Sequence, residues 1–154
     1  MKTLLTLSFL LPGVLCAQDL IFDGFLKYQD LTLPNMTATL HMGDSLIEKS
    51  ATTEKGQFKF ELAFDHIYTL TFEGPGFATK TIKVDTRYVP QESREFGFEY
   101  GGFTINMVPY SKRVQRLLRD RVVARVAYDP ANKGFMHDQV HAADMKAKLG
   151  ELVD

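Results

Sequence analysis

Residues 57–84 alternate apolar and polar side chains with a period of two. The first two apolar runs are Phe58, Phe60, Leu62 and Phe64, and then Tyr68, Leu70 and Phe72. Successive side chains of a strand point to opposite faces, so this period indicates half-buried strands. Asp65-His66 separates these two runs, and residues 73–76 separate the second from a third run at 77–84. We therefore expect three consecutive antiparallel strands joined by short turns.

Further strands are predicted on both sides of this stretch. Residues 20–28 indicate a strand with a bulge at Asp23-Gly24, and residues 36–42 alternate regularly. Residues 45–52 alternate poorly and carry charges, which is typical of an edge strand. In residues 96–107 the apolar positions change parity at Gly101-Gly102, where we expect a bulge or kink.

The composition changes after Tyr110. Within residues 111–125 the basic residues outnumber the single acid Asp120, and they are Lys112, Arg113, Arg116, Arg119, Arg121 and Arg125. Apolar residues recur at helical spacing, which predicts a short amphipathic helix over 111–119. Residues 122–128 are rich in β-branched side chains and predict a last strand, followed by a turn at 129–134 and a terminal helix over 138–149.

These elements predict an all-β fold. About seven short strands with turn signals every 8 to 12 residues are typical of a Greek-key β-sandwich. We place the sandwich at residues 18–109. Residues 110–154 form a basic C-terminal extension with a last strand and a short helix.

Several motifs resemble those of the carboxypeptidase regulatory-like domain. They are residues 53–62, with Gly56 shortly before Phe58, then Tyr68-Thr69-Leu70-Thr71-Phe72, then Gly76-Phe77 and Thr81-Ile82-Lys83-Val84. The resemblance covers residues 20–86 and implies a transthyretin-like sandwich that is not itself catalytic. Residues 123–130, with Phe135 and Asp138, resemble the tail of small secreted proteins of Bacteroidota that carry such a domain.

The first 17 residues have the order of a secretory signal peptide. Lys2 precedes a short apolar run that ends in Cys16-Ala17. A cysteine at this place is lipidated in bacterial lipoproteins, but Leu15 stands where those signals have a small residue, so we favour plain cleavage after Ala17. The remaining chain has no cysteine and depends on its core rather than on disulfides. We expect it in the periplasm or at the outer membrane.

Composition and charge narrow the classes of partner. Hydrophobic residues make up 45% and charged residues 24%, which is typical of a globular domain, and the formal net charge is −1. That charge gives no general attraction to nucleic acid. No later apolar run is long enough for a transmembrane helix.

The basic helix is the candidate partner-binding site. Its cationic residues Lys112, Arg113, Arg116 and Arg119 suit a phosphate, a lipid headgroup or an acidic protein surface. The competing interpretation is an ordinary solvated helix face. No aromatic residues alternate with these cations, which argues against nucleic acid.

His137 and His141 are the candidate metal ligands, with Asp138 and Asp144 beside them. On one helix they would lie a turn apart, a spacing that allows chelation. No third convergent ligand accompanies them, so the sequence favours a solvated helix face and predicts no metal and no cofactor.

No catalytic constellation is evident, because no serine lies in a nucleophile-elbow context and no carboxylates stand out as a pair. The sequence therefore predicts a secreted, non-enzymatic interaction or accessory module of the cell envelope, with a protein partner. The alternative is a module that binds a glycan or another small ligand, with Tyr28, Tyr88, Tyr100 and Tyr110 as a stacking platform. Ser45 lies in Asp44-Ser45-Leu46, which resembles an acceptor motif for O-linked glycan.

Overall fold

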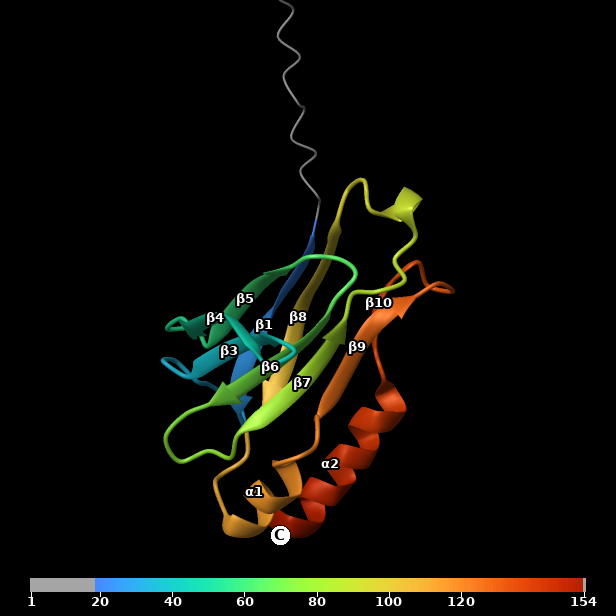
Figure 1. Ribbon diagram of the computed structural model, residues 1–154. Helices are drawn as coiled ribbons and strands as arrows, with labels where there is room; N and C mark the ends of the chain where they lie inside the picture. Colours follow the sequence, from blue (N-terminus) through green and yellow to red (C-terminus); the bar gives the residue numbers. More distant parts are fainter. Residues whose placement is uncertain (1–18, 154) are drawn as a thin grey trace, which may run out of the picture.

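The computed structural model describes residues 19–153, and their strands form two sheets packed face to face (Figure 1). The predicted signal peptide and Cys16 lie outside the described residues. The smaller sheet contains β1 (Leu20–Tyr28), β2 (Leu31–Thr32), β5 (Gln57–Leu62) and β8 (Phe98–Asn106). The larger sheet has the order β10 (Gly134–His137), β9 (Ala124–Asp129), β7 (Lys80–Asp85), β6 (Ile67–Glu73), β3 (Thr37–Met42) and β4 (Ser45–Ala51).

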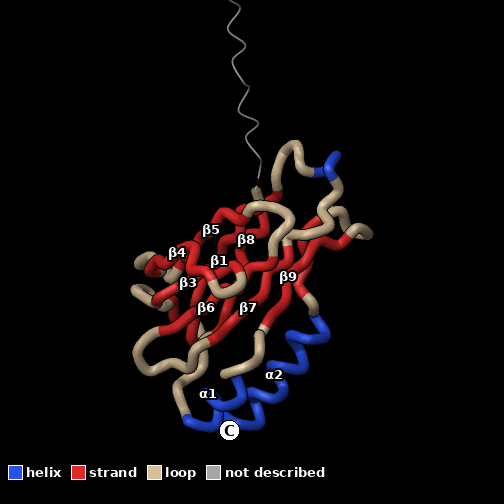
Figure 2. Tube along the Cα trace, viewed as in Figure 1, coloured by secondary structure: helices blue, strands red, loops and turns tan. Residues whose placement is uncertain are grey.

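Three helices complete the described chain: η1 (Gln91–Ser93), α1 (Lys112–Leu118) and α2 (Gln139–Val153). The two α-helices lie together at one end of the sandwich, and α2 runs beside β9 (Figure 2). None of the helices in the described part of the chain has both the length and the hydropathy to cross a membrane.

The predicted β-sandwich is confirmed, with ten strands in the described chain where about seven were expected. The main core consists of buried side chains from the inner faces of both sheets, such as Phe22 and Phe60 from the smaller sheet and Leu70 and Phe72 from the larger. The predicted alternation in β5 and β6 matches this burial. The sequence missed β2 and β10, because two to four residues are too few to show a period.

The predicted hairpin between β5 and β6 is wrong. β5 pairs with β1 in the smaller sheet, whereas β6 lies between β3 and β7 in the larger one. The connection at Asp65-His66 therefore carries the chain from one sheet to the other. Alternation could not reveal this, because both strands bury one face in the same core. The predicted antiparallel pairing of β6 with β7 is confirmed.

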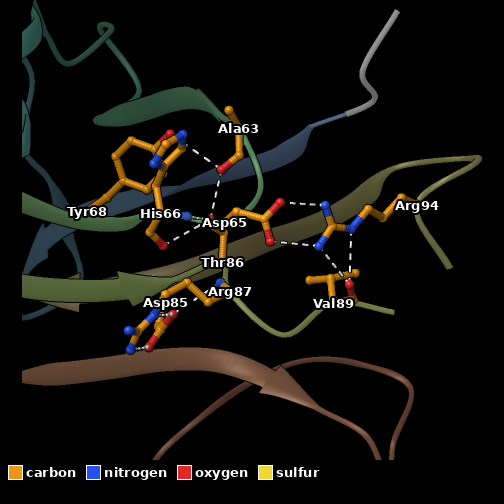
Figure 3. Close-up of polar contacts among 9 residues, drawn as sticks. All are labelled: Ala63, Asp65, His66, Tyr68, Asp85, Thr86, Arg87, Val89 and Arg94. Carbon is orange, nitrogen blue, oxygen red and sulfur yellow. Dashed lines mark hydrogen bonds and ion pairs between the residues drawn. The ribbon is translucent and has the colours of Figure 1, made fainter. Parts of the chain in front are cut away.

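Hydrogen bonds of Thr86 stabilise this connection between β5 and β6 (Figure 3). Its buried hydroxyl lies 2.7 Å from the carbonyl oxygen of Ala63 and 3.0 Å from that of His66, and it accepts the N–H of His66 at 3.1 Å. The backbone of Thr86 also exchanges hydrogen bonds with Asp65 and His66. One side chain thus satisfies polar groups on both sides of the step between sheets.

Arg94 links the loop between β7 and β8 to the connection between β5 and β6. Its guanidinium donates to both carboxylate oxygens of Asp65, at 2.6 and 2.7 Å, and also to the carbonyl oxygen of Val89. The hydrogen bond from Arg94 holds the pKa of Asp65 below its usual value. Because Asp65 is exposed, this pair positions the loop more than it stabilises the fold.

Replacing Thr86 by valine should lower the free energy of unfolding by about 1–3 kcal/mol. Valine keeps the volume of the buried Thr86 side chain but leaves partly buried backbone groups of Ala63 and His66 without this partner. Urea denaturation measures the loss. Thr71→Val is the matched control, because the Thr71 hydroxyl makes only a 3.5 Å contact with Thr81. Equal effects of the two substitutions would contradict a special role for Thr86.

The predicted bulge at Gly101-Gly102 is confirmed in β8, whereas β1 has no extra residue at Asp23-Gly24 and pairs with β5 there without interruption. β1 and β8 pair in parallel, and their register shifts between Phe22 and Gly24. A Cβ at Gly24 would lie 2.0 Å from the carbonyl oxygen of Phe103, so the close approach of the strands requires glycine there. The shift lets Tyr100 and Phe103 both place their rings against Phe22, which explains the change of parity.

The residues after Pro109 belong to the sandwich. α1 lies where the sequence predicted a short helix. β9 lies where the last strand was predicted, but one more strand, β10, follows it. β9 pairs in parallel with β7, and β10 pairs with β9, so this segment extends the larger sheet. A second cluster of buried side chains joins α1 and α2 to the sheet end, and it consists of Ala78, Val114, Leu118, Met145 and Leu149.

Candidate functional site

The first candidate site is the basic face of α1, defined as Lys112, Arg113 and Arg116 of the helix together with its C-cap residue Arg119. All four side chains are exposed. Val114 and Leu118 are buried on the opposite side of the helix, which confirms its amphipathic pattern. The site residues predicted for partner binding therefore share one surface.

Local contacts fix the orientation of this face. The Ser111 hydroxyl accepts the N–H of Val114 at 3.1 Å and caps the helix. The side-chain oxygen of Gln115 accepts the backbone N–H of Thr79 at 2.9 Å, which ties α1 to the start of β7. The basic face is thus carried by an anchored helix rather than by a loose tail.

The basic face has no internal neutralising partner among residues 19–153. The three ion pairs of that part of the chain join Arg87 to Asp85, Arg94 to Asp65, and Lys148 to Asp144. None involves a residue of the basic face. Arg125 lies apart from it, on β9 beside Lys83 of β7. The four cations of α1 are therefore available to an external anionic surface.

The interpretation of His137 and His141 as neighbours on one helix is wrong. His137 is the last residue of β10, and only His141 lies in α2. The Nδ1 atom of His137 is 3.1 Å from the Tyr100 hydroxyl, and the Nε2 atom of His141 is 2.7 Å from the Val122 carbonyl oxygen. Within the described residues, no three His, Cys, Asp or Glu side chains group as metal ligands would.

The four tyrosines suggested as a stacking platform have different surroundings. The Tyr28 ring packs on Phe77 and the Tyr100 ring on Phe22, whereas Tyr88 and Tyr110 are exposed in loops. Ser45 is exposed at the start of the edge strand β4.

A second candidate site, which the sequence did not reveal, is a pocket of about 540 Å³ between β7, β8, β9 and α2. It lies where the main core meets the second cluster. Its lining is mainly apolar and includes Ile82, Phe103, Ile105, Ala124, Met145 and Leu149. This volume is in the range of about 300–1,000 Å³ that is common for small-molecule sites.

Lys80 is the unusual residue of this pocket. Its side chain lines the pocket, although the residue is only 7% exposed. The amine donates a hydrogen bond to the Asn106 carbonyl oxygen at 2.5 Å. Burial disfavours the charged form and lowers the pKa of Lys80 to about 8.

One sequence signal could have identified Lys80. It has the same parity as Ile82 and Val84 in β7, and all three are buried on the inner face. A lysine in phase with core residues is rare, because burying an ammonium group is costly. Apart from Ile82, the other pocket residues come from segments far from Lys80 in the chain, and no local pattern joins them to it.

Comparisons with known proteins do not assign this chain to a family. No protein-family model and no curated protein matches the chain. Among solved structures, S.CueP is similar with a TM-score of 0.38 and 11% identity over 57% of this chain and 60% of that one. 3-Chlorocatechol 1,2-dioxygenase from Rhodococcus opacus 1CP gives 0.38 and 12% over 60% of each chain. The matches thus span less than two thirds of those proteins, and such low TM-scores carry no inference about function.

Proposed function

We propose that this protein is an exported, non-enzymatic β-sandwich that binds a protein partner in the cell envelope through the basic face of α1. The single observation behind the proposal is the set of four exposed cations on an anchored helix, with no ion pair to a described carboxylate. The sequence features of residues 1–17 support export, and the motifs in residues 20–86 support a transthyretin-like, carboxypeptidase regulatory-like domain.

The expected partner surface is acidic. Arginine makes two parallel hydrogen bonds to a carboxylate, and three of the four cations of the basic face are arginines. Exposed charges at an interface act mainly on the rate of association and on specificity, and salt screens them. Binding through this face should therefore weaken when the salt concentration rises.

Reversing the charge of Arg113, Arg116 and Arg119 to glutamate should reduce recovery of the partner at least about tenfold, because like charges then face the acidic surface. The measurement is affinity purification from the native envelope with quantitative mass spectrometry. Raising the salt from about 0.1 M to about 1 M shortens the Debye length from about 10 Å to about 3 Å and should lower recovery by the wild type as well.

The matched control reverses Lys49, Lys55 and Lys59, which are also exposed but lie on or between β4 and β5. It makes the same change in net charge at a different surface. A protein that is recovered with the control and lost with the α1 variant supports the proposal. Equal recovery with both variants, or equal loss, would overturn it.

A further inference from the structure

The pocket beside Lys80 lies between the main core and the second cluster of buried side chains. Ile82, Ile105 and Ala124 belong to the main core, and Met145 and Leu149 belong to the second cluster. α2 supplies one wall of the pocket, and the inner face of the larger sheet supplies another. Methionine is unbranched and adapts its shape, so Met145 suits a wall that must fit a flexible apolar chain.

The Lys80 amine has no counter-ion in the described chain. Its hydrogen bond goes to a neutral backbone carbonyl, that of Asn106, and no described carboxylate lies within ion-pair distance. An ammonium group has three N–H donors, so this contact uses one of them. Buried charges in proteins are normally paired, and an unpaired one beside a cavity indicates a place for an anion.

The rest of the described pocket lining carries no negative charge. Its other ionisable residues are Lys146 on α2 and His137 on β10, and within residues 19–153 it contains no aspartate or glutamate. An anionic group would therefore meet attraction and no repulsion in the pocket. The apolar walls exclude a ligand that is polar throughout, and they favour one acidic group joined to a hydrocarbon chain.

We propose that this pocket binds a medium-chain carboxylic acid, with the carboxylate at the Lys80 amine and the hydrocarbon chain along Met145 and Leu149 of α2. The carboxylate would supply the missing counter-ion in a site largely removed from water, where a charged hydrogen bond is strong. The chain would cover apolar side chains of both clusters. This inference does not depend on the basic face of α1.

Titration calorimetry of the purified protein with decanoate and with decan-1-ol tests the proposal. The two probes share a ten-carbon chain, but only decanoate carries a charge. We expect decanoate to bind about 30-fold more tightly or better, since losing a desolvated charge pair costs about 2 kcal/mol or more at 1.4 kcal/mol for each factor of ten. Equal affinities, or no binding of decanoate, would overturn the proposal without any substitution.

Two lysine substitutions locate the acidic group. Lys80→Met should weaken decanoate binding at least about tenfold and leave decan-1-ol binding unchanged or stronger. Lys146→Met removes the other lysine of the pocket, which is exposed, and should change decanoate binding less than threefold. If Lys146→Met has the larger effect, the carboxylate lies at the surface and the proposed orientation is wrong. The Arg113, Arg116 and Arg119 variant should bind decanoate like the wild type, which separates this inference from the proposed function.

Discussion

Replacing Phe22 by alanine should lower the free energy of unfolding by about 3–5 kcal/mol. Phe22 is completely buried at the centre of the smaller sheet. Its ring stacks on Tyr100 at 5.6 Å between centroids and also meets Phe58 and Phe103 at about 6 Å. Truncation removes these contacts and leaves a cavity that strands fixed on both sides cannot fill by relaxing.

Phe96→Ala is the matched control for this substitution. Phe96 is 85% exposed, so the same chemical change should alter stability by no more than about 0.5 kcal/mol. Urea denaturation followed by circular dichroism measures both variants. A loss below about 1 kcal/mol for Phe22→Ala would show that the aromatic cluster does not hold β1 and β8 as described.

The second large effect is a rise in stability with pH that depends on Lys80. Burial lowers the pKa of this side chain to about 8 in the folded protein, compared with the usual 10.5. Between these two values the unfolded chain holds the proton and the folded protein has released it. Stability therefore increases as the pH rises through this window. The difference in pKa corresponds to about 3 kcal/mol, which is missing below about pH 8 and fully regained above about pH 10.5.

Lys80→Met should remove this rise, and at about pH 7 it should be more stable than the wild type by up to about 3 kcal/mol. Urea denaturation of both proteins between about pH 7 and pH 10 measures the difference. Burial raises the pKa of Tyr68 and Tyr100, which opposes the rise at the alkaline end, but both tyrosines remain in the variant. His137 and Lys146, which line the same pocket, also remain. Parallel pH profiles for the two proteins would contradict a buried, charged Lys80.

The two predictions for Lys80 concern the same feature of the fold. A lysine that destabilises the free protein at neutral pH has no structural advantage over methionine at this position. A carboxylate ligand would restore stability by pairing with the ammonium group in the folded protein only. Strongly perturbed ionisable groups in clefts are common at functional sites.

Much of the fold could be predicted from local pattern. Alternation located β1, β3 and β5 to β7, because each of these strands buries one face and a strand repeats every two residues. Charges on a poorly alternating run located the edge strand β4, and β-branched residues located β9. The change of parity near Gly101 predicted the bulge that brings Tyr100 and Phe103 to the same ring. Helical spacing predicted α1 and placed its cations opposite Val114 and Leu118.

Local pattern could not predict which strands pair. A buried face looks the same in either sheet, so the sequence joined β5 and β6 in a hairpin, whereas the fold separates them across the core. The parallel pairings of β1 with β8 and of β7 with β9 connect segments far apart in the chain. They are decided by long-range packing, which leaves no period in the sequence.

The sequence by itself determined the class of fold, the position of the edge strand and the exposed cations of α1, since each follows from the order of apolar and polar residues along one element. Only the tertiary structure decided that His137 and His141 lie on different elements, and that Lys80 faces a pocket shared by β7, β8, β9 and α2. A pocket is the space left between packed elements, so its shape and charge depend on contacts that no single stretch of sequence contains.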